Sequence, residues 1–333
     1  MAKVDDLLDE MFEAEERKDR GTVLEKADLI LELDPNHTDA LWASAMHILP
    51  PVDRRGMHRS EPDLVTCSKA VGRLKRLVAA DPTHRAGWAR GALLISQHLG
   101  MTEAAIQWYE DMRVPFPTDP TPCIEQAELL IRMGRYADAA GRLAACFARD
   151  MEEIPGHQRF RVERMNQTIE RYLDDPEMVA FRPQDPKHRS WKDIETMRHA
   201  KPASEMFLFF MLAGPLVFWE GMLLREFVTP SWWKMAVAFV LVYISVMLVK
   251  RFSIKLTAKR NRPVRDLWRA IEVESTSGMV CVPELIRGSK LYRTVLQRDY
   301  PLAFVERHDK ILAKAVLLPK RWELTLPDWT EEE

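Results

Sequence analysis

Few side chains in this 333-residue chain have the types and spacing that catalysis or metal binding requires. The sequence contains no GxxxxGK[ST] phosphate loop, no GxSxG nucleophile elbow, no HExxH zinc motif and no GxGxxG dinucleotide loop. Its nine histidines are scattered, and its four cysteines form no CxxC pair that would indicate a zinc ribbon or a disulfide framework. We therefore predict a protein that is not an enzyme and that has no cofactor and no metal site.

Two groups with chemical potential remain. Cys281 and His308 could act as a nucleophile and its base, but no third group in the sequence orients them, and we interpret both as ordinary structural residues. Glu220 lies in a strongly apolar segment, where an ionisable side chain is by default a functional candidate. The alternative is an interfacial position, because the neighbouring Trp219 and Arg225 would bring Glu220 close to water and to a pairing partner.

The surroundings of Glu220 predict a membrane protein. Mean hydropathy over the whole chain is −0.26, a soluble value, yet residues 206–224 carry one charge and residues 235–249 carry none. A bilayer core needs about 20 apolar residues in helical form. The second segment reaches this length from Trp232, if the tryptophans lie at the headgroups and Lys234 extends outward. We predict two transmembrane helices that form a hairpin over residues 205–250.

The flanks of the two segments predict the orientation. Interface anchors are expected at Trp219, Trp232, Trp233, Lys234, Lys250 and Arg251. Seven basic residues and no acid follow the second segment: Lys250, Arg251, Lys255, Lys259, Arg260, Arg262 and Arg265. Basic flanks stay in the cytoplasm and attract anionic lipids. We expect an integral membrane protein with both termini cytoplasmic, in the inner membrane if the cell is prokaryotic.

The region before the hairpin repeats. Gly100 and Gly134 are 34 residues apart, as are Ala105 and Ala139. Residues 23–37 match residues 70–84, and each segment ends in Asp-Pro after an amphipathic helix. A period in this range is typical of helix–turn–helix arrays.

On these residues, residues 4–150 resemble the tetratricopeptide repeat family, whose 34-residue helix pairs stack into a right-handed superhelix. The positions that carry the resemblance in the second helices are Val23, Ala27 and Pro35; Ala70, Leu74 and Pro82; Ala105, Tyr109 and Pro117; and Ala139 and Leu143. In the first helices they are Leu41 with Ala45, Trp88 with Ala92, and Ala127 with Gly134. The first unit has a weak pair, the third has an extra residue in its first helix, and the fourth lacks its closing proline. The alternative is an unrelated helical bundle.

The resemblance implies a concave groove lined by first helices, which would bind a protein partner. The residues expected to face it are Leu8, Phe12, Trp42, Met46, Leu93, Ile124 and Glu128; the alternative for each is the core between helices. Family members that grip acidic C-terminal tails use Lys, Asn and Arg here, and an apolar groove cannot replace the hydration of such a tail. Residues 4–34 carry twelve acids against four bases, either as a solvated helix face or as a surface that selects a basic partner.

The whole chain is predicted to be all-α. We expect a repeat domain of four helix pairs (1–150), a capping helix with a linker (151–204), the hairpin (205–250) and a small cytoplasmic helical domain (251–333). The net charge of −2 argues against a nucleic-acid binder. The function predicted is that of a membrane-anchored adaptor or scaffold. The alternative is an accessory or structural subunit of a larger membrane enzyme or transport complex, which it contacts mainly through the two spans.

Overall fold

The structure of this chain is a computed structural model. It describes residues 2–51, 60–174, 181–227 and 232–317. The regular elements of these residues are helices, so the all-α class is confirmed, and the β contact among them is an isolated parallel bridge between Val280 and Leu317.

The chain forms two compact units. The first contains Met1–Pro186, Arg269–Val282 and Leu296–Glu333, which is described up to residue 317, and the second contains Lys187–Trp268 and Pro283–Val295. The sequence predicted residues 251–333 as a separate domain, whereas the units follow a different division. The segments after the hairpin are divided between the two units, because the apolar faces of their helices are buried against earlier parts of the chain.

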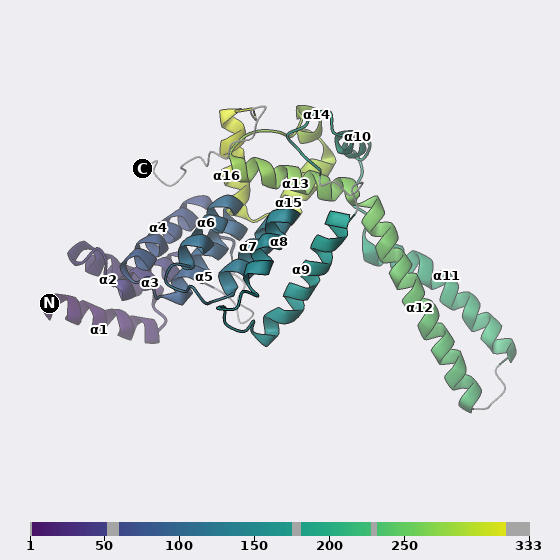
Figure 1. Ribbon diagram of the computed structural model, residues 1–333, viewed down its shortest axis with the longest axis horizontal. Coiled ribbons are helices and arrows are strands. Elements are labelled where there is room, and N and C mark those ends of the chain that lie inside the picture. Colours follow the sequence, from purple (N-terminus) through teal and green to yellow (C-terminus); the bar gives the residue numbers. More distant parts are fainter. Residues whose placement is uncertain (1, 52–59, 175–180, 228–231, 318–333) are drawn as a thin grey trace. The chain divides into compact units, whose positions relative to one another are not determined.

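Helices of the first unit follow one another as antiparallel pairs (Figure 1). The pairs are α1 (Ala2–Glu16) with α2 (Arg20–Leu33); α3 (Thr38–Ile48) with α4 (Leu64–Ala80); α5 (Arg85–Leu93), extended by η1 (Leu94–His98), with α6 (Thr102–Met112); and α7 (Thr121–Arg132) with α8 (Tyr136–Ala145). Each helix packs on the next, and α9 (Gly156–Asp174) packs on α7 and α8. A helix pair therefore lies at each of the four units that the sequence marks.

The two Asp-Pro segments form the same turn. Asp34 ends α2 and Asp81 ends α4, and the carboxylate of each accepts a hydrogen bond from the main-chain N–H two residues later, at 3.1 and 2.9 Å. His37 and His84 then cap the next helix, because Nδ1 of each ring accepts from the N–H three residues later, at 3.5 and 2.9 Å. These side chains satisfy N–H groups that a helix start leaves without partners.

Two departures from a plain helix agree with the sequence. The extra residue of the third unit is accommodated in η1, a π-helical turn, which is how a helix absorbs one inserted residue. Gly100 and Gly134 follow the first helices of the third and fourth pairs with φ of +66° and +76°. Only glycine adopts this left-handed conformation at low cost, which explains its recurrence 34 residues apart.

The small positions of the repeat pattern lie in the core. Val23, Ala70, Ala105 and Ala139 are fully buried, so neighbouring helices can approach closely at each of them. At Gly91 the approach is closest, since an added Cβ would lie 2.3 Å from the ring of Trp108 on α6.

Helices from the end of the chain complete this core. α13 (Arg262–Ser277) and α16 (Leu302–Lys314) pack on the third helix pair through Gly100. Thr276 Oγ1 donates to Gly100 O at 3.4 Å, and an added Cβ at Gly100 would lie 2.4 Å from the ring of Phe304. Arg307 is fully buried and donates to the carbonyl oxygens of Leu99 (3.3 Å) and Ser275, so it caps η1 and α13. Burial lowers the pKa of Arg307 to about 9.

The second unit is built around two long helices. α11 (Glu205–Phe227) and α12 (Trp232–Arg260) lie side by side and antiparallel, and the unit also contains α10 (Arg189–Thr196), α14 (Glu284–Arg287) and parts of α13 and α15 (Lys290–Asp299). Asn261 joins the base of the hairpin: its Nδ2 donates to Ala203 O at 2.8 Å and its Oδ1 accepts from Ala203 N at 2.9 Å. Among the described residues, one helix is long and apolar enough to cross a membrane, over Glu205–Met222.

Candidate functional site: a cavity in the helix array and an apolar hairpin

A cavity of about 330 Å³ opens on the face formed by the first helices of successive pairs. Helices α5, α7 and α9 and the turn η1 supply its walls, and α6 supplies one side chain to its floor. The residues that line it are Ala89, Leu93, Ser96, Gln97, Tyr109, Glu125, Glu128, Leu129, Arg132 and Arg161. A cavity of this size accommodates one or two side chains of a bound segment.

Three side chains form the apolar part of the lining, which we call its floor: Leu93 of α5, Leu129 of α7 and Tyr109 of α6. Desolvation by burial raises the pKa of Tyr109, so this phenol stays neutral at any physiological pH.

The rim of the cavity is charged. Arg161 on α9 makes ion pairs with two glutamates of α7: Nη1 and Nη2 contact Glu125 at 2.5 and 2.7 Å, and Nε contacts Glu128 at 2.6 Å. The hydrogen bond to Glu125, followed by the charges of both glutamates, raises the pKa of Arg161. With Arg132, which also lines the cavity, the rim contains two negative and two positive side chains and no excess of either charge.

A second ion pair involves Arg132, another residue of the cavity lining. Arg132, at the end of α7, pairs with Glu272 on α13. Glu272 is almost fully buried, and desolvation raises the pKa of its carboxyl group although Arg132 opposes the shift. The chain segment after the hairpin therefore positions a side chain of the cavity.

Of the residues that the sequence places in the groove, Leu93 and Glu128 line this cavity. Trp42 and Met46 are half-buried on α3, and the ring of Trp42 lies 5.0 Å from that of His84. Both lie on the first helix of the second pair, outside the lining of this cavity.

At the first pair, Phe12 is 43% exposed, whereas Leu8 is half-buried against the core of α1, α2 and α3. The prediction for Ile124 is wrong. Its side chain is fully buried in the cluster that contains Cys123 and Leu143, because it points between α7 and α8 rather than into the groove.

Sequence reasoning missed the largest polar contribution to the site. Residues 151–204 were expected to supply only a cap, yet Arg161 of α9 reaches the cavity. The signal in the sequence is the pair of glutamates three residues apart on α7, which have no basic residue one turn away on their own helix apart from Arg132.

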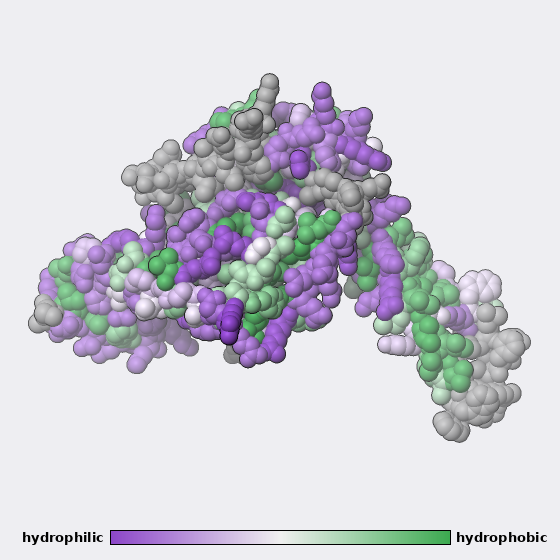
Figure 2. All heavy atoms as spheres, in the orientation of Figure 1, coloured by the Kyte–Doolittle hydropathy of each residue, from purple (hydrophilic) through white to green (hydrophobic). Residues whose placement is uncertain are grey.

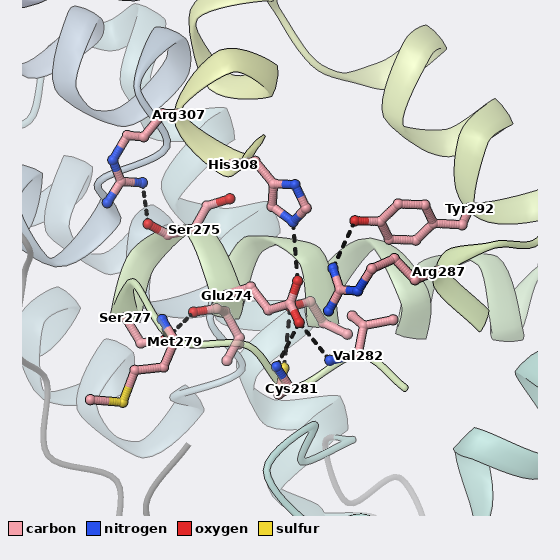
Figure 3. Close-up of polar contacts among 12 residues, drawn as sticks. Glu274, Ser275, Ser277, Met279, Cys281, Val282, Arg287, Tyr292, Arg307 and His308 are labelled. Atoms are coloured by element: carbon pink, nitrogen blue, oxygen red, sulfur yellow. Dashed lines mark hydrogen bonds and ion pairs between the residues drawn. The ribbon is translucent and has the colours of Figure 1, made fainter. Parts of the chain in front are cut away.

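Cys281 and His308 do come close to a common third group (Figure 3). Glu274 on α13 is fully buried: its Oε1 accepts from the main-chain N–H of Cys281 (2.6 Å) and Val282 (2.5 Å), and its Oε2 lies 3.0 Å from Nε2 of His308. Glu274 thus holds the backbone of Cys281, whose Sγ lies 3.7 Å from Ala270 O. The arrangement ties the loop after α13 to α16, and this structural role accounts for all three side chains.

The hairpin has a surface of a different kind. Large apolar side chains are exposed along both helices, for example Phe207, Phe218, Phe239 and Leu248. Figure 2 shows hydrophobic residues over the described length of this hairpin. An exposed apolar patch of this extent marks a surface that contacts another protein or a lipid bilayer.

The predicted membrane anchors are placed as follows. Trp219 is 62% exposed, and Lys250 and Arg251 are exposed at the other end of the apolar stretch. The side chains of Trp232, Trp233 and Lys234 lie outside the described residues.

Glu220 is half-buried on α11. Its Oε2 is shielded from solvent and has no hydrogen-bond partner among the described residues. Arg225, the pairing partner considered from the sequence, has a side chain outside the described residues.

The seven basic residues after the apolar stretch are all exposed. None of them forms an ion pair with a carboxylate in the part of the chain that the structure describes, and Arg265 donates to the main chain, at Ala258 O (2.9 Å). Their charges are therefore available to external anions.

Comparison with known proteins finds no family model and no curated protein that matches this chain. Its function is therefore argued from its own residues. The structure offers two candidate binding surfaces: a cavity with an apolar floor and a charged rim, and an apolar hairpin with a basic base.

Proposed function

We propose that this protein is a membrane-anchored adaptor of the tetratricopeptide repeat type. Its array of helix pairs binds a segment of a partner protein on the cytoplasmic side, and its two-helix hairpin holds that partner at the membrane. The proposal assigns no catalytic activity to the chain.

The cavity in the groove carries the binding role. An apolar floor of Leu93, Leu129 and Tyr109 favours an aliphatic or aromatic side chain, and burial of such a side chain contributes about 1.5–3 kcal/mol. The charged side chains of the rim, Glu125, Glu128, Arg132 and Arg161, favour polar groups next to it. The partner segment that fits is therefore an apolar residue flanked by polar ones.

The hairpin supports the anchoring role. α11 has 23 residues and is about 34 Å long, enough for a hydrocarbon core of about 30 Å. In a bilayer, the exposed phenylalanines and leucines of the hairpin would contact lipid chains instead of water. The unpaired cations at its base would lie at the headgroups on the cytoplasmic side, where each contributes about 1 kcal/mol with anionic lipids.

Site-specific photocrosslinking in the full chain tests the groove. A photoreactive amino acid at Gln97, which lines the cavity, is compared with one at Val114, which is 82% exposed outside it. We expect one partner protein to be crosslinked from Gln97 and not from Val114, and the adduct to decrease at least tenfold when Leu93→Glu is added. If both positions give the same adducts, and if Leu93→Glu changes neither, the groove does not bind a partner.

Topology is tested separately. A tag after residue 20 should be accessible only from the cytoplasm, and the protein should remain in membranes after alkaline carbonate washing. A tag that is accessible only from outside the cell, or a protein that is released into water without detergent, contradicts the anchoring role.

One observation favours the accessory-subunit alternative. Gly214 and Gly221 are exposed on α11, and a Cβ added at either would meet no atom within 4 Å. Small residues seven positions apart permit close packing of a second transmembrane helix, and Glu220 lies beside them. In that case exchange of the hairpin for an unrelated one abolishes assembly, whereas loss of the groove cavity does not.

A further inference from the structure

Three cations share one side of the last turns of α12. Arg251, Lys255 and Lys259 follow one another at intervals of four residues, so they lie within about 80° around the helix and at levels about 6 Å apart along its axis. All three are exposed, and none of them forms an ion pair with a carboxylate in the described part of the chain. We call these three residues the basic column.

The basic column points away from the other helix of the hairpin. Ser253 is fully buried and its Oγ donates to Glu205 O, at the start of α11, at 3.4 Å. Thr257, four residues later on the same side of α12, is also buried. Each of these two residues is two positions from a cation of the column, which is about 160° away around the helix. The column therefore faces the surroundings of the hairpin.

An apolar stripe runs beside the basic column. Phe252 and Leu256 are exposed, and each follows a cation of the column by one position, about 100° around the helix. With Leu248, which is also exposed, they continue the apolar surface of the hairpin at intervals of four residues. A soluble anion or an acidic protein segment would leave this stripe in water. A lipid matches both features, because its chains contact the stripe while its headgroup reaches the cations.

We propose that the basic column binds a lipid whose headgroup carries at least one phosphate monoester in addition to its phosphodiester; the proposal rests on the membrane anchoring proposed above. The headgroup layer is about 5–7 Å thick on each side of a bilayer, whereas the column extends about 12 Å along α12. A phosphodiester in that layer pairs with Arg251, next to the end of the apolar stretch. Only a further phosphate, which projects toward the cytoplasm, also reaches Lys255 and Lys259.

Native mass spectrometry of the full chain in detergent micelles tests the proposal. The protein is titrated with dioctanoyl phosphatidylinositol bisphosphate and, separately, with dioctanoyl phosphatidylserine, and the bound lipids are counted. We expect one bisphosphate lipid to be retained, with a Kd at least fivefold lower than that of the serine lipid. Lys255→Gln and Lys259→Gln should each weaken its binding about fivefold, the factor that corresponds to about 1 kcal/mol for each cation near anionic headgroups.

Matched controls separate the column from net charge and a lipid from a soluble phosphate. Arg260→Gln removes an exposed cation from the same turn, about 100° around the helix from Lys259, and should weaken binding less than twofold. Lys310→Gln, at an exposed cation of α16, should have no effect. Inositol trisphosphate, a headgroup without chains, should bind at least tenfold more weakly than the bisphosphate lipid, because it does not contact Phe252 and Leu256.

Failure of this proposal is distinguishable from failure of the anchoring role. If alkaline carbonate releases the wild-type protein from membranes, the anchoring role fails. If the protein stays in membranes but binds the bisphosphate lipid no better than the serine lipid, the column does not select a second phosphate. Equal losses in Arg260→Gln and Lys259→Gln would show that net charge acts without the column. Unchanged lipid binding in Lys255→Gln and Lys259→Gln would leave the column to an acidic protein segment and overturn the proposal.

Discussion

Removal of the carboxyl group of Glu274 tests how the end of the chain is held to the repeats. In Glu274→Ala, the main-chain N–H groups of Cys281 and Val282 lose their acceptor, and Nε2 of His308 loses its neighbour at 3.0 Å. All of these groups are buried or nearly so, and each buried donor left without an acceptor costs about 1–3 kcal/mol. We expect a total loss of about 4 kcal/mol.

The loss is large enough to measure by thermal unfolding. At about 2–4 °C per kcal/mol in a protein of this size, the apparent Tm should fall by about 10 °C. The assay is tryptophan fluorescence of the full chain in detergent micelles. All variants are heated at one scan rate, because the apparent Tm of an irreversibly unfolding protein depends on the scan rate. A fall of less than about 2 °C refutes the argument.

Three controls separate the network from a general effect. Glu274→Gln keeps an oxygen for the two N–H groups and should cost only about 1 kcal/mol. Glu284→Ala, at a side chain that is 89% exposed, should change stability by less than about 0.5 kcal/mol. His308→Ala combined with Glu274→Ala should cost about 1–2 kcal/mol less than the sum of the single changes, because the two side chains interact directly.

Three further predictions concern the turns, the membrane and a cap. Gly100→Ala should cost about 3 kcal/mol and Gly134→Ala about 1 kcal/mol by thermal unfolding, because both have positive φ and an added Cβ at Gly100 would also lie 2.4 Å from the ring of Phe304; a loss of less than about 1 kcal/mol in Gly100→Ala would contradict that contact. Phe239→Lys, at a side chain that is 74% exposed, should raise the cost of insertion by about 3 kcal/mol and lower the carbonate-resistant fraction, whereas an increase in that fraction would argue against lipid contact. Asp63→Ala should cost about 1 kcal/mol at neutral pH, since Asp63 caps α4. Hydrogen bonds from Thr66 lower the pKa of Asp63, so the contribution is full above its ordinary pKa of 3.8 and is lost as the pH falls through the lowered pKa; a difference between wild type and variant that stays constant in acid would refute the cap.

Local features of the fold could be predicted from the sequence. The 34-residue spacing located the helix pairs, the Asp-Pro segments located the ends of two helices, and one surplus residue marked the first helix of the third unit, where the structure has a π-helical turn. These features depend on residues within about one helix turn of each other, where backbone geometry and capping are fixed by the nearest side chains. The prediction that Ile124 faces the groove failed. The apolar stripe of an amphipathic helix is wide, so its sequence pattern does not distinguish a residue at the groove from one between two helices.

The amino-acid sequence by itself determined where the helices lie, that they are amphipathic in the repeats and apolar all round near Phe218 and Phe239, and where charge accumulates. Only the tertiary structure decided which faces meet. It brought Arg161 to two glutamates more than thirty residues earlier, Phe304 to Gly100, and His308 to Glu274. The physical reason is that periodicity specifies that a face must be buried, whereas its partner is selected by the shape and charge of surfaces that exist only once the chain has folded.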